Sequence, residues 1–221
     1  MIVAAHDEAE RVGATLEALR EAFPRGRLVV ADDASTDGTP DVALAHGAEL
    51  VGRHRPHGKG ANVTAAAHSV LGLADEPDPP TFLLCDADLG ASARHLVSLV
   101  EAVERRKCDL AVAAFRHRRG GGFGIVLGFA RWAIRRRCGY LAEAPISGQR
   151  AMRAAVLRSL VPFAAGYGME TAMTIDAVQA GYRLCEIELD LDHRATGRTP
   201  AGFLHRARQL RDIARAYLAR R

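Results

Sequence analysis

Long hydrophobic runs and aromatic side chains are both scarce in this sequence of 221 residues. No apolar stretch approaches the roughly 20 residues that cross a membrane. The chain from Met1 onward is typical of a strand rather than a signal peptide. Aromatic residues make up 5% of the chain and no single basic stripe is evident, which argues against nucleic acid as a partner. We therefore expect a cytoplasmic globular protein with no nucleic-acid partner.

Cysteine and lysine are also scarce. The four cysteines form no C-x-x-C pair and have no histidine at the spacing of a metal ligand, so we expect four thiols in a reducing compartment. They are Cys85, Cys108, Cys138 and Cys185. Lysine occurs only at Lys59 and Lys107, so that 28 of the 30 basic residues are arginine. Arginine suits the recognition of phosphate and carboxylate, although a GC-rich genome would produce the same bias.

Glycine-rich loops are absent where three classes of enzyme need them. No G-x-G-x-x-G follows the first expected strand, Ile2–Ala5, which excludes a dinucleotide dehydrogenase. The segment Ala5-His6-Asp7-Glu8 contains no glycine, which argues against a sugar nucleotidyltransferase. The loop His57-Gly58-Lys59-Gly60 is not a Walker A loop, because Gly60 stands where Ser or Thr is required.

Strand and helix patterns alternate along the chain. Short apolar runs predict strands at Ile2–Ala5, Leu28–Ala31, Glu49–Gly52, Thr81–Cys85, Asp109–Ala114 and Arg183–Leu189, and Ser147–Arg150 is expected to be a turn. Apolar residues at helical spacing predict helices at Asp7–Ala22, Pro40–His46, Ala61–Leu73, Ser92–Arg105, Phe123–Arg137, Glu170–Ala180 and Ala201–Arg221. The alternation predicts an α/β fold, with a mostly parallel central sheet and helices on both faces. Ligands of such sheets bind outside the carboxyl ends of the strands, so polar clusters that follow strands should converge there.

Two acidic clusters directly follow expected strands. Asp86 and Asp88 come straight after an apolar strand, where side chains two residues apart point to the same side. Such a pair can share a divalent cation that also binds diphosphate oxygens, although a solvated turn uses aspartate as well. Asp32 and Asp33 end the second strand, where a carboxylate can bind a base or ribose hydroxyls.

Three further segments carry candidate site residues. Glycines bracket Lys59 just before a helix, where an ammonium and backbone N–H groups can meet a phosphate; a solvated loop lysine is the alternative. Glu170 begins a helix after a glycine-rich turn, where it either interacts with the helix dipole or orients an acceptor hydroxyl. His193 follows acids after the last expected strand, near Arg198, which suits a metal or anion site, whereas a lone histidine is often structural.

The order and spacing of these clusters resemble family 2-type glycosyltransferases with the nucleotide-diphospho-sugar transferase (GT-A) fold. Residues 2–11 resemble the usual V-I-P-x-Y-N-E-E start, and residues 30–39 match V-D-D-G-S-T-D-G-T closely. Gly58-Lys59-Gly60 and Asp86-Ala87-Asp88 fall at the expected intervals. Ser147–Arg150, Gly166–Glu170 and His193-Arg194 resemble the branch of dolichyl-phosphate mannose synthases and glucosyl-3-phosphoglycerate synthases.

The resemblance implies one GT-A domain over residues 1–221, with the nucleotide sugar bound by 1–115 and the acceptor by 116–221. It implies a metal-dependent hexosyltransferase that uses a UDP- or GDP-hexose together with Mg²⁺ or Mn²⁺. Asp88 and Glu170 are the catalytic residues that it implies, and the implied metal ligands are Asp86, Asp88 and His193. The implied substrate-binding residues are Ala4, His6, Glu8, Asp32, Asp33, Lys59, Asp86, Arg150 and Arg198.

The acceptor stays open, because the chain departs from this branch at residues that would hold it. Phe123 replaces an arginine after the central glycines, and Ala195 replaces an asparagine after the expected metal histidine. A polyprenyl phosphate and a small anionic molecule are both compatible with the remaining arginines. Ala34, in turn, replaces the usual glycine of the second motif, so the turn there must accommodate a Cβ.

Partners beyond the substrates are suggested by charge. With a net charge of +4, the basic helices 123–137 and 201–221 could rest on the anionic inner face of a membrane; solvated arginines outside a packed helix are the alternative. Dimers occur in the resembled branches, so a homodimer is compatible with the resemblance. A non-catalytic nucleotide-sugar-binding protein is the main alternative function, followed by a sugar nucleotidyltransferase.

Overall fold

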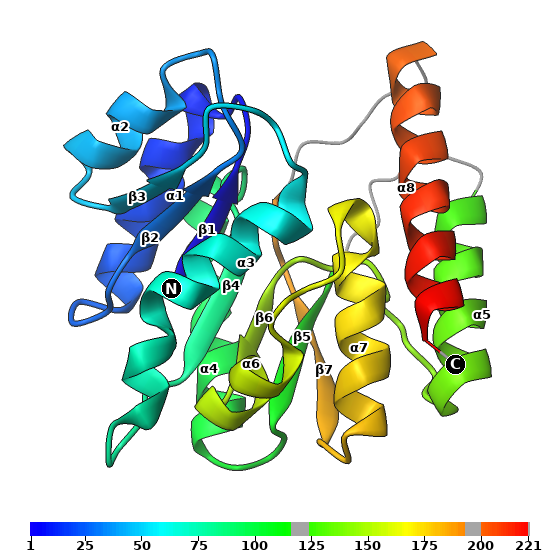
Figure 1. Cartoon of the computed structure of the whole chain (residues 1–221). Helices are drawn as coiled ribbons and strands as arrows, with labels where there is room; N and C mark the ends of the chain where they lie inside the picture. The colour runs from blue at the N-terminus through cyan, green and yellow to red at the C-terminus, as the bar shows by residue number, and fades with distance from the viewer. Residues whose placement is uncertain (116–123, 193–199, 221) are drawn as a thin grey trace.

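The computed structural model describes residues 1–115, 124–192 and 200–220, which are built around a seven-stranded sheet (Figure 1). The strands are β1 (Ile2–Ala5), β2 (Val29–Asp32), β3 (Glu49–Gly52), β4 (Phe82–Asp86), β5 (Leu110–Phe115), β6 (Arg150–Met152) and β7 (Leu184–Leu189). Their order across the sheet is β3-β2-β1-β4-β6-β5-β7. Only β6 runs antiparallel to its neighbours, β4 and β5. The predicted α/β fold with a mostly parallel sheet is thereby confirmed.

Helices cover both faces of the sheet. They are α1 (Ala9–Ala22), α2 (Thr39–Ala45), α3 (Lys59–Val70), α4 (Val97–Glu104), α5 (Ile125–Cys138), α6 (Ala154–Leu160), α7 (Met169–Gln179) and α8 (Pro200–Ala219), with 3₁₀ turns η1 (Leu71–Asp75), η2 (Gly90–Leu96) and η3 (Gly166–Gly168). On one face, α1, η2 and α4 pack against residues such as Val3 and Leu83. On the other face, α3, α6 and α7 pack against the alternate residues, such as Ile2 and Leu84. Because both faces are buried, the strands are apolar almost throughout.

An outer layer of two helices lies beyond α7. In Figure 1, α7 stands between the sheet and the pair α5 and α8. Ile134 of α5 and Ile175 of α7 are fully buried against each other in a small separate cluster. Within the described ranges, no helix is long and apolar enough to cross a membrane.

Two elements, β6 and α6, were not predicted from the sequence. Ser147–Arg150 was expected to be only a turn, whereas Arg150 begins the three-residue strand β6. A three-residue strand is too short to show alternation, and all of its residues are buried. The seven residues of α6 are also too few for a clear helical period.

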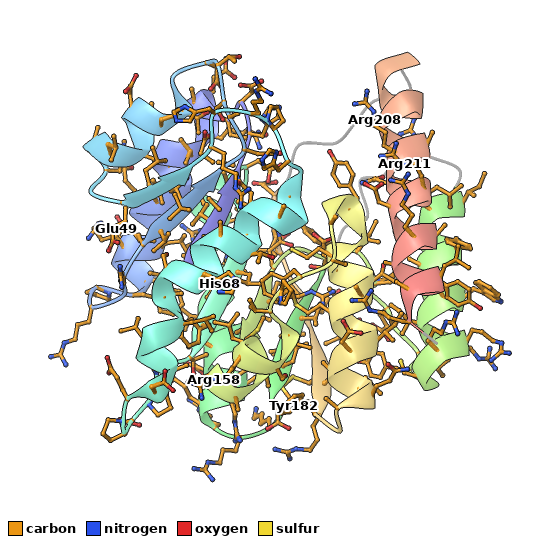
Figure 2. All side chains as sticks on the ribbon, in the orientation of Figure 1. Glu49, His68, Arg158, Tyr182, Arg208 and Arg211 are labelled. Atoms are coloured by element: carbon orange, nitrogen blue, oxygen red, sulfur yellow. A yellow bond between two sulfur atoms is a disulfide. The ribbon has the colours of Figure 1, made fainter. Side chains whose placement is uncertain are left out.

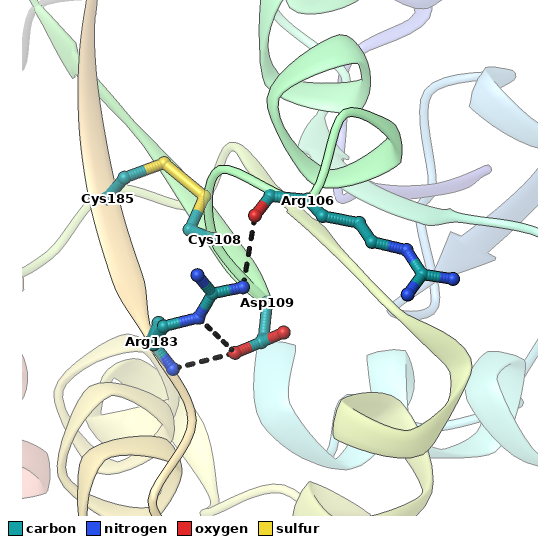
Figure 3. Close-up of a disulfide and its surroundings, with 5 residues drawn as sticks. All are labelled: Arg106, Cys108, Asp109, Arg183 and Cys185. Atoms are coloured by element: carbon teal, nitrogen blue, oxygen red, sulfur yellow. Dashed lines mark hydrogen bonds and ion pairs between the residues drawn. A yellow bond between two sulfur atoms is a disulfide. The ribbon is translucent and has the colours of Figure 1, made fainter.

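The cysteines also differ from the expectation of four thiols. Cys108 and Cys185 form a disulfide, with their Cα atoms 5.8 Å apart (Figure 3). The two cysteines are 77 residues apart in the sequence and become neighbours only because β5 pairs with β7. Among the described residues, Cys85 and Cys138 remain thiols, the former buried and the latter half-buried.

Candidate functional site

A cleft of about 1300 Å³ opens at the carboxyl ends of β1, β2 and β4, with α3 on one side and α8 on the other. It is lined by eight of the residues that the sequence analysis singled out. These are Ala4, His6, Glu8, Asp33, Lys59, Asp86, Asp88 and Glu170. The cleft therefore combines side chains from five separate stretches of the chain.

Strand register explains why the acidic clusters meet. Ala4 of β1 pairs with Asp86 of β4, and Ala5 of β1 pairs with Asp32 of β2. The pairing continues beyond β4, because the backbone N–H of Ala87 donates to the carbonyl oxygen of Ala4 at 3.0 Å. Since the three strands are parallel, the residues that follow them reach the same edge of the sheet.

Lys59, the first residue of α3, is the centre of a charged cluster at the bottom of the cleft. Its Nζ lies 2.5 Å from Asp86 Oδ1 and 2.7 Å from Glu170 Oε1. Burial disfavours the ammonium, but the charges of and hydrogen bonds to the two carboxylates outweigh burial and raise the pKa of Lys59. Removing one partner of such a buried pair would leave an uncompensated charge, so the three side chains depend on one another.

Gly148 and Gln149 complete this cluster from the second half of the chain. Gln149 Nε2 donates to Asp86 Oδ2 at 2.8 Å, and the hydroxyl of Ser147 donates to Gln149 Oε1 at 3.0 Å. A Cβ on Gly148 would lie 2.5 Å from Lys59 Nζ and 2.6 Å from Asp86 Oδ2, so any side chain here would displace this ion pair. No role was predicted for Gly148 or Gln149 from the sequence, because their contacts arise from the unpredicted β6.

Asp33 anchors the loop that leads into α3. Its carboxylate accepts hydrogen bonds from the backbone N–H groups of His57 and Gly58 at 2.8 and 2.9 Å. Its carbonyl oxygen lies 2.9 Å from Nδ1 of His6. These contacts hold Asp33 and His6 together at the end of the cleft formed by β1 and β2.

Two predicted substrate-binding residues do not line the cleft. Asp32 lines a separate, shallow pocket, where its carboxylate accepts hydrogen bonds from the backbone N–H and the hydroxyl of Ser35. Arg150 is fully buried and donates to the carbonyl oxygen of Ser147 and the hydroxyl of Thr174. Burial lowers the pKa of Arg150 to about 10, and the nearby negative charge of Glu170 opposes that shift. Asp32 and Arg150 therefore do not line this cleft, and their roles in substrate binding stay predictions.

His193 and Arg198 lie outside the described residues, as does the segment 116–123 with its three arginines. The histidine was the third expected metal ligand. Within the described part of the chain, no three histidine, cysteine or acidic side chains form a group that could hold a metal ion.

Arginines of α8, together with Arg220 just after its end, form the opposite wall of the cleft. These residues are Arg208, Arg211, Arg215 and Arg220. Figure 2 shows two of them, Arg208 and Arg211, extending from α8. The spacings of three and four residues keep Arg208, Arg211 and Arg215 near one helical face. No basic stripe was predicted from the sequence, although the helical period from position 208 onward could have revealed this one.

The sequence comparison identifies the family. Residues 1–161 match the family model described as Glycosyl transferase family 2. The chain belongs to glycosyl transferase family 2. This glycosyltransferase is 30% identical over 210 residues to the undecaprenyl-phosphate mannosyltransferase of Micrococcus luteus, covering 89% of this chain and 84% of the relative. It is also 30% identical over 197 residues to an uncharacterized glycosyltransferase of Mycobacterium tuberculosis, covering 84% and 83% of the two chains.

Solved structures of glucosyl-3-phosphoglycerate synthase from Mycobacterium tuberculosis share the fold of this glycosyltransferase. A complex with Mn²⁺, UDP and glucosyl-3-phosphoglycerate matches with a TM-score of 0.76 at 24% identity, over 99% of this chain and 78% of the synthase. A complex with Mg²⁺ and UDP matches with a TM-score of 0.77 at 24% identity, over 99% and 77% of the two chains. These matches confirm the predicted GT-A fold, and the family match confirms the predicted glycosyltransferase class.

Proposed function

We propose that this glycosyltransferase moves a hexose from a nucleoside-diphosphate sugar to a phosphate-bearing acceptor, with Mg²⁺ or Mn²⁺ as cofactor. The observation that carries the proposal is the meeting of Asp33, Lys59 and Asp88 in one cleft. The similar proteins support the substrate classes. One is named for undecaprenyl phosphate, and the other is crystallised with UDP, a divalent metal and a phosphoglycerate product.

The donor would lie along the cleft from β2 toward α3. Ala4, His6, Glu8 and Asp33 line the end that suits the nucleoside. Lys59 would meet the diphosphate, since it starts α3, where free backbone N–H groups also favour anions. The ion pairs with Asp86 and Glu170 already fix the ammonium of Lys59. Donor binding therefore costs little additional side-chain entropy at Lys59.

The carboxylates of Asp86 and Asp88 fit a divalent cation. Mg²⁺ is commonly held by one or two carboxylates together with substrate phosphates, so two acids at one strand end are sufficient protein ligands. Gly148 allows Asp86 to hold its position at the strand end, because a Cβ there would lie 2.6 Å from Oδ2. When bound, the cation would neutralise charge on the departing nucleoside diphosphate. His193 stays a predicted third ligand.

Glu170 is proposed to orient the acceptor. Its side chain lines the cleft and is held by Lys59 at 2.7 Å, so its position is fixed although it is 4% exposed. A carboxylate fixed in this way can accept a hydrogen bond from the acceptor or the sugar.

The arginines of α8 support a phosphate-bearing acceptor. Arg211 pairs with Asp212 and Arg220 with Asp176. Arg208 and Arg215 line the same cleft and make no hydrogen bond or ion pair within the described residues. Two such guanidinium groups opposite the diphosphate end suit a phosphate monoester, through charge-assisted hydrogen bonds.

Release of nucleoside diphosphate from a panel of UDP- and GDP-hexoses tests the proposal. With Mn²⁺ and either undecaprenyl phosphate or 3-phosphoglycerate as acceptor, one donor should be consumed. Asp88→Ala should lower the rate at least 100-fold, of the order lost with one electrostatic catalytic group. Asp78→Ala, which removes an exposed carboxylate before β4, is the matched control and should keep the rate.

Two results would contradict the proposal. Donor binding with no turnover for any acceptor would favour the non-catalytic nucleotide-sugar-binding protein. Full activity in Asp88→Ala would remove the proposed role of the acidic pair.

We also propose peripheral membrane contact through the outer layer. Ile125 and Trp132 of α5 and Leu218 of α8 are 65%, 49% and 67% exposed, and Arg135 and Arg136 lie on the same helix as the first two. Exposed apolar side chains beside arginines suit the surface of an anionic bilayer. Cosedimentation with phosphatidylglycerol vesicles, but not with phosphatidylcholine vesicles, is expected; equal recovery with both contradicts it.

The homodimer stays a prediction, which light scattering tests.

A further inference from the structure

Asn62 is a polar residue in an apolar stretch of α3. It is the only asparagine in the chain, and its side chain is buried, at 1% exposure. Val63 and Ala66, which follow on the same helix, are part of the apolar core. A leucine at position 62 would bury no polar group, so packing alone does not explain an amide here.

Both polar atoms of Asn62 lack a partner. Neither Oδ1 nor Nδ2 makes a hydrogen bond, and neither is reached by solvent. Elsewhere in the described ranges, the only such atoms are single nitrogens of Arg137 and Arg150. A buried amide without partners destabilises the protein, and buried polar groups in proteins are nearly always paired. The unpaired amide therefore points to a ligand that completes it.

The position of Asn62 indicates which part of a ligand it meets. It lines the cleft, as do Ala4, Ala31 and Asp33, and α3 packs across β1 and β2 at this end. Lys59 stands one helical turn earlier and supplies the positive charge for phosphate. A carboxamide is neutral and offers an acceptor as well as donors, so it suits a base or a sugar better than a phosphate.

We propose that Asn62 binds the nucleoside part of the donor. Nδ2 donates to a carbonyl or hydroxyl oxygen of the base or ribose, and Oδ1 accepts from a neighbouring N–H or O–H. This role rests on the proposed function and adds to it a residue that contacts the nucleoside. Binding turns the amide from the wall of the cleft toward the ligand.

Substitution of Asn62 separates stability from binding. Asn62→Leu removes the unpaired amide, so the melting temperature of the ligand-free protein should rise by about 2–4 °C. Its affinity for UDP or GDP, whichever the wild type binds, should fall about tenfold. Its affinity for pyrophosphate, measured by calorimetry in the same Mn²⁺ buffer, should not change.

Thr64→Val is the matched control on the same helix. The hydroxyl of Thr64 is paired, since it donates to the carbonyl oxygen of Gly60 and accepts from the backbone N–H of Phe163. Its removal should lower the melting temperature and leave the affinity for UDP or GDP unchanged, the opposite pattern to Asn62→Leu.

A readout on the wild-type protein avoids substitution altogether. Because the chain has one asparagine, selective ¹⁵N labelling of asparagine gives a single pair of side-chain amide signals. Saturating UDP or GDP should shift this pair, and pyrophosphate should leave it in place. The labelled protein decides the matter if Asn62→Leu fails to fold.

The outcomes distinguish this inference from the proposed function. Amide signals that do not move with a bound nucleotide, or an unchanged nucleotide affinity in Asn62→Leu, overturn the role of Asn62 alone. A wild-type protein that binds no nucleoside diphosphate overturns both.

Discussion

Ala34 holds a backbone conformation that residues with a Cβ rarely adopt. Its φ is +59°, in the left-handed region, where an L-residue costs about 1–2 kcal/mol relative to the right-handed one. The turn that it forms lets Ser35 donate two hydrogen bonds to Asp32. Glycine is usual at this position of the resembled motif, and it would adopt this positive φ without the steric conflict of a Cβ.

Ala34→Gly should therefore stabilise the protein, by about 0.5–1 kcal/mol. Glycine removes the steric conflict, and part of the gain is lost to the greater freedom of the unfolded chain. Urea unfolding at pH 7 measures the difference. The same substitution at Ala14, an exposed position inside α1, should destabilise by about 1 kcal/mol, so equal signs at both positions would contradict the explanation.

At the scale of single residues, the sequence predicts which residue types form the site better than it predicts where their side chains point. The acids after β2 and β4 could be recognised because polar residues end apolar strands. The sequence could not show which of Asp32 and Asp33 faces the cleft. Neighbouring side chains of a strand point to opposite faces, so the exact end of the strand decides which of the two acids does. Arg150 and Asn62 show the same limit, because burial depends on elements that pack from elsewhere in the chain.

Asp109 ties together the beginnings of β5 and β7. Its Oδ2 accepts from the backbone N–H of Arg183 at 3.0 Å and from Nε of Arg183 at 3.3 Å, while Oδ1 lies 3.2 Å from Arg153 (Figure 3 shows the Arg183 contacts). Burial alone would raise the pKa of Asp109, but the hydrogen bonds from Arg183 and the charges of both arginines outweigh it and lower the pKa. Asp109 therefore binds its proton less readily in the folded state.

Asp109→Asn should destabilise the protein by about 1–2 kcal/mol at pH 7, because a charge-assisted network loses its acceptor charge. Since folding lowers the pKa of Asp109, its contribution is complete above the unfolded value of about 3.9 and is lost as pH falls through the folded value. The difference between wild type and variant in denaturant unfolding should therefore shrink below about pH 4.

The control for this prediction is Asp75→Asn. Asp75 pairs with Arg158 at the surface, with 75% of its side chain exposed, so its loss should change stability by less than about 0.5 kcal/mol. A difference for Asp109→Asn that persists unchanged at pH 3 would mean that the carboxylate charge is not the cause.

At the scale of elements, apolar strands between turn residues were predicted well, whereas the internal division of a longer helical segment was not. The strands Ile2–Ala5 and Glu49–Gly52 were placed as the structure has them, because apolar runs between turn residues are unambiguous. The expected helix Ser92–Arg105 divides into η2 and α4. Hydrophobic period does not distinguish a 3₁₀ turn from the first turns of an α-helix, so the helix period alone could not show this division.

The sheet runs through both halves of the whole molecule. β5, which ends the first half, pairs only with β6 and β7 of the second half. β4 is joined to β5 solely through β6, which lies between them. The first half alone would therefore leave one strand unpaired, with Leu110 and Val112 exposed to solvent.

We predict that a fragment of residues 1–115 does not fold by itself and that the full chain unfolds in one cooperative transition. The fragment would lack the partners of β5, so its circular dichroism should show no cooperative melting and it should bind a hydrophobic dye. In calorimetry, the full chain should give equal calorimetric and van't Hoff enthalpies. A fragment that melts cooperatively would mean that the two halves are separate folding units.

The layout of the whole cleft was predictable only in part. The convergence of acids and Lys59 followed from the rule that ligands bind at the carboxyl ends of parallel strands. The arginine wall of α8 did not follow, because no rule connects the last helix to that edge; its place depends on packing against α7 and η3. The contact of Gly148 was not predicted for a related reason, because β6, the strand that positions it, could not be recognised from the sequence.

The antiparallel direction of β6 links the registration of the sheet to the chemistry of the cleft. Its chain enters the sheet at the cleft edge, so Gly148 precedes the strand beside Lys59 and Asp86. A slip of one position would exchange this glycine for Ser147 or Gln149, whose Cβ would occupy the place where ammonium and carboxylate meet. A mispaired β6 would thus be recognised by the loss of the contact between Lys59 and Asp86. The charged centre can assemble only when β6 pairs in the correct register.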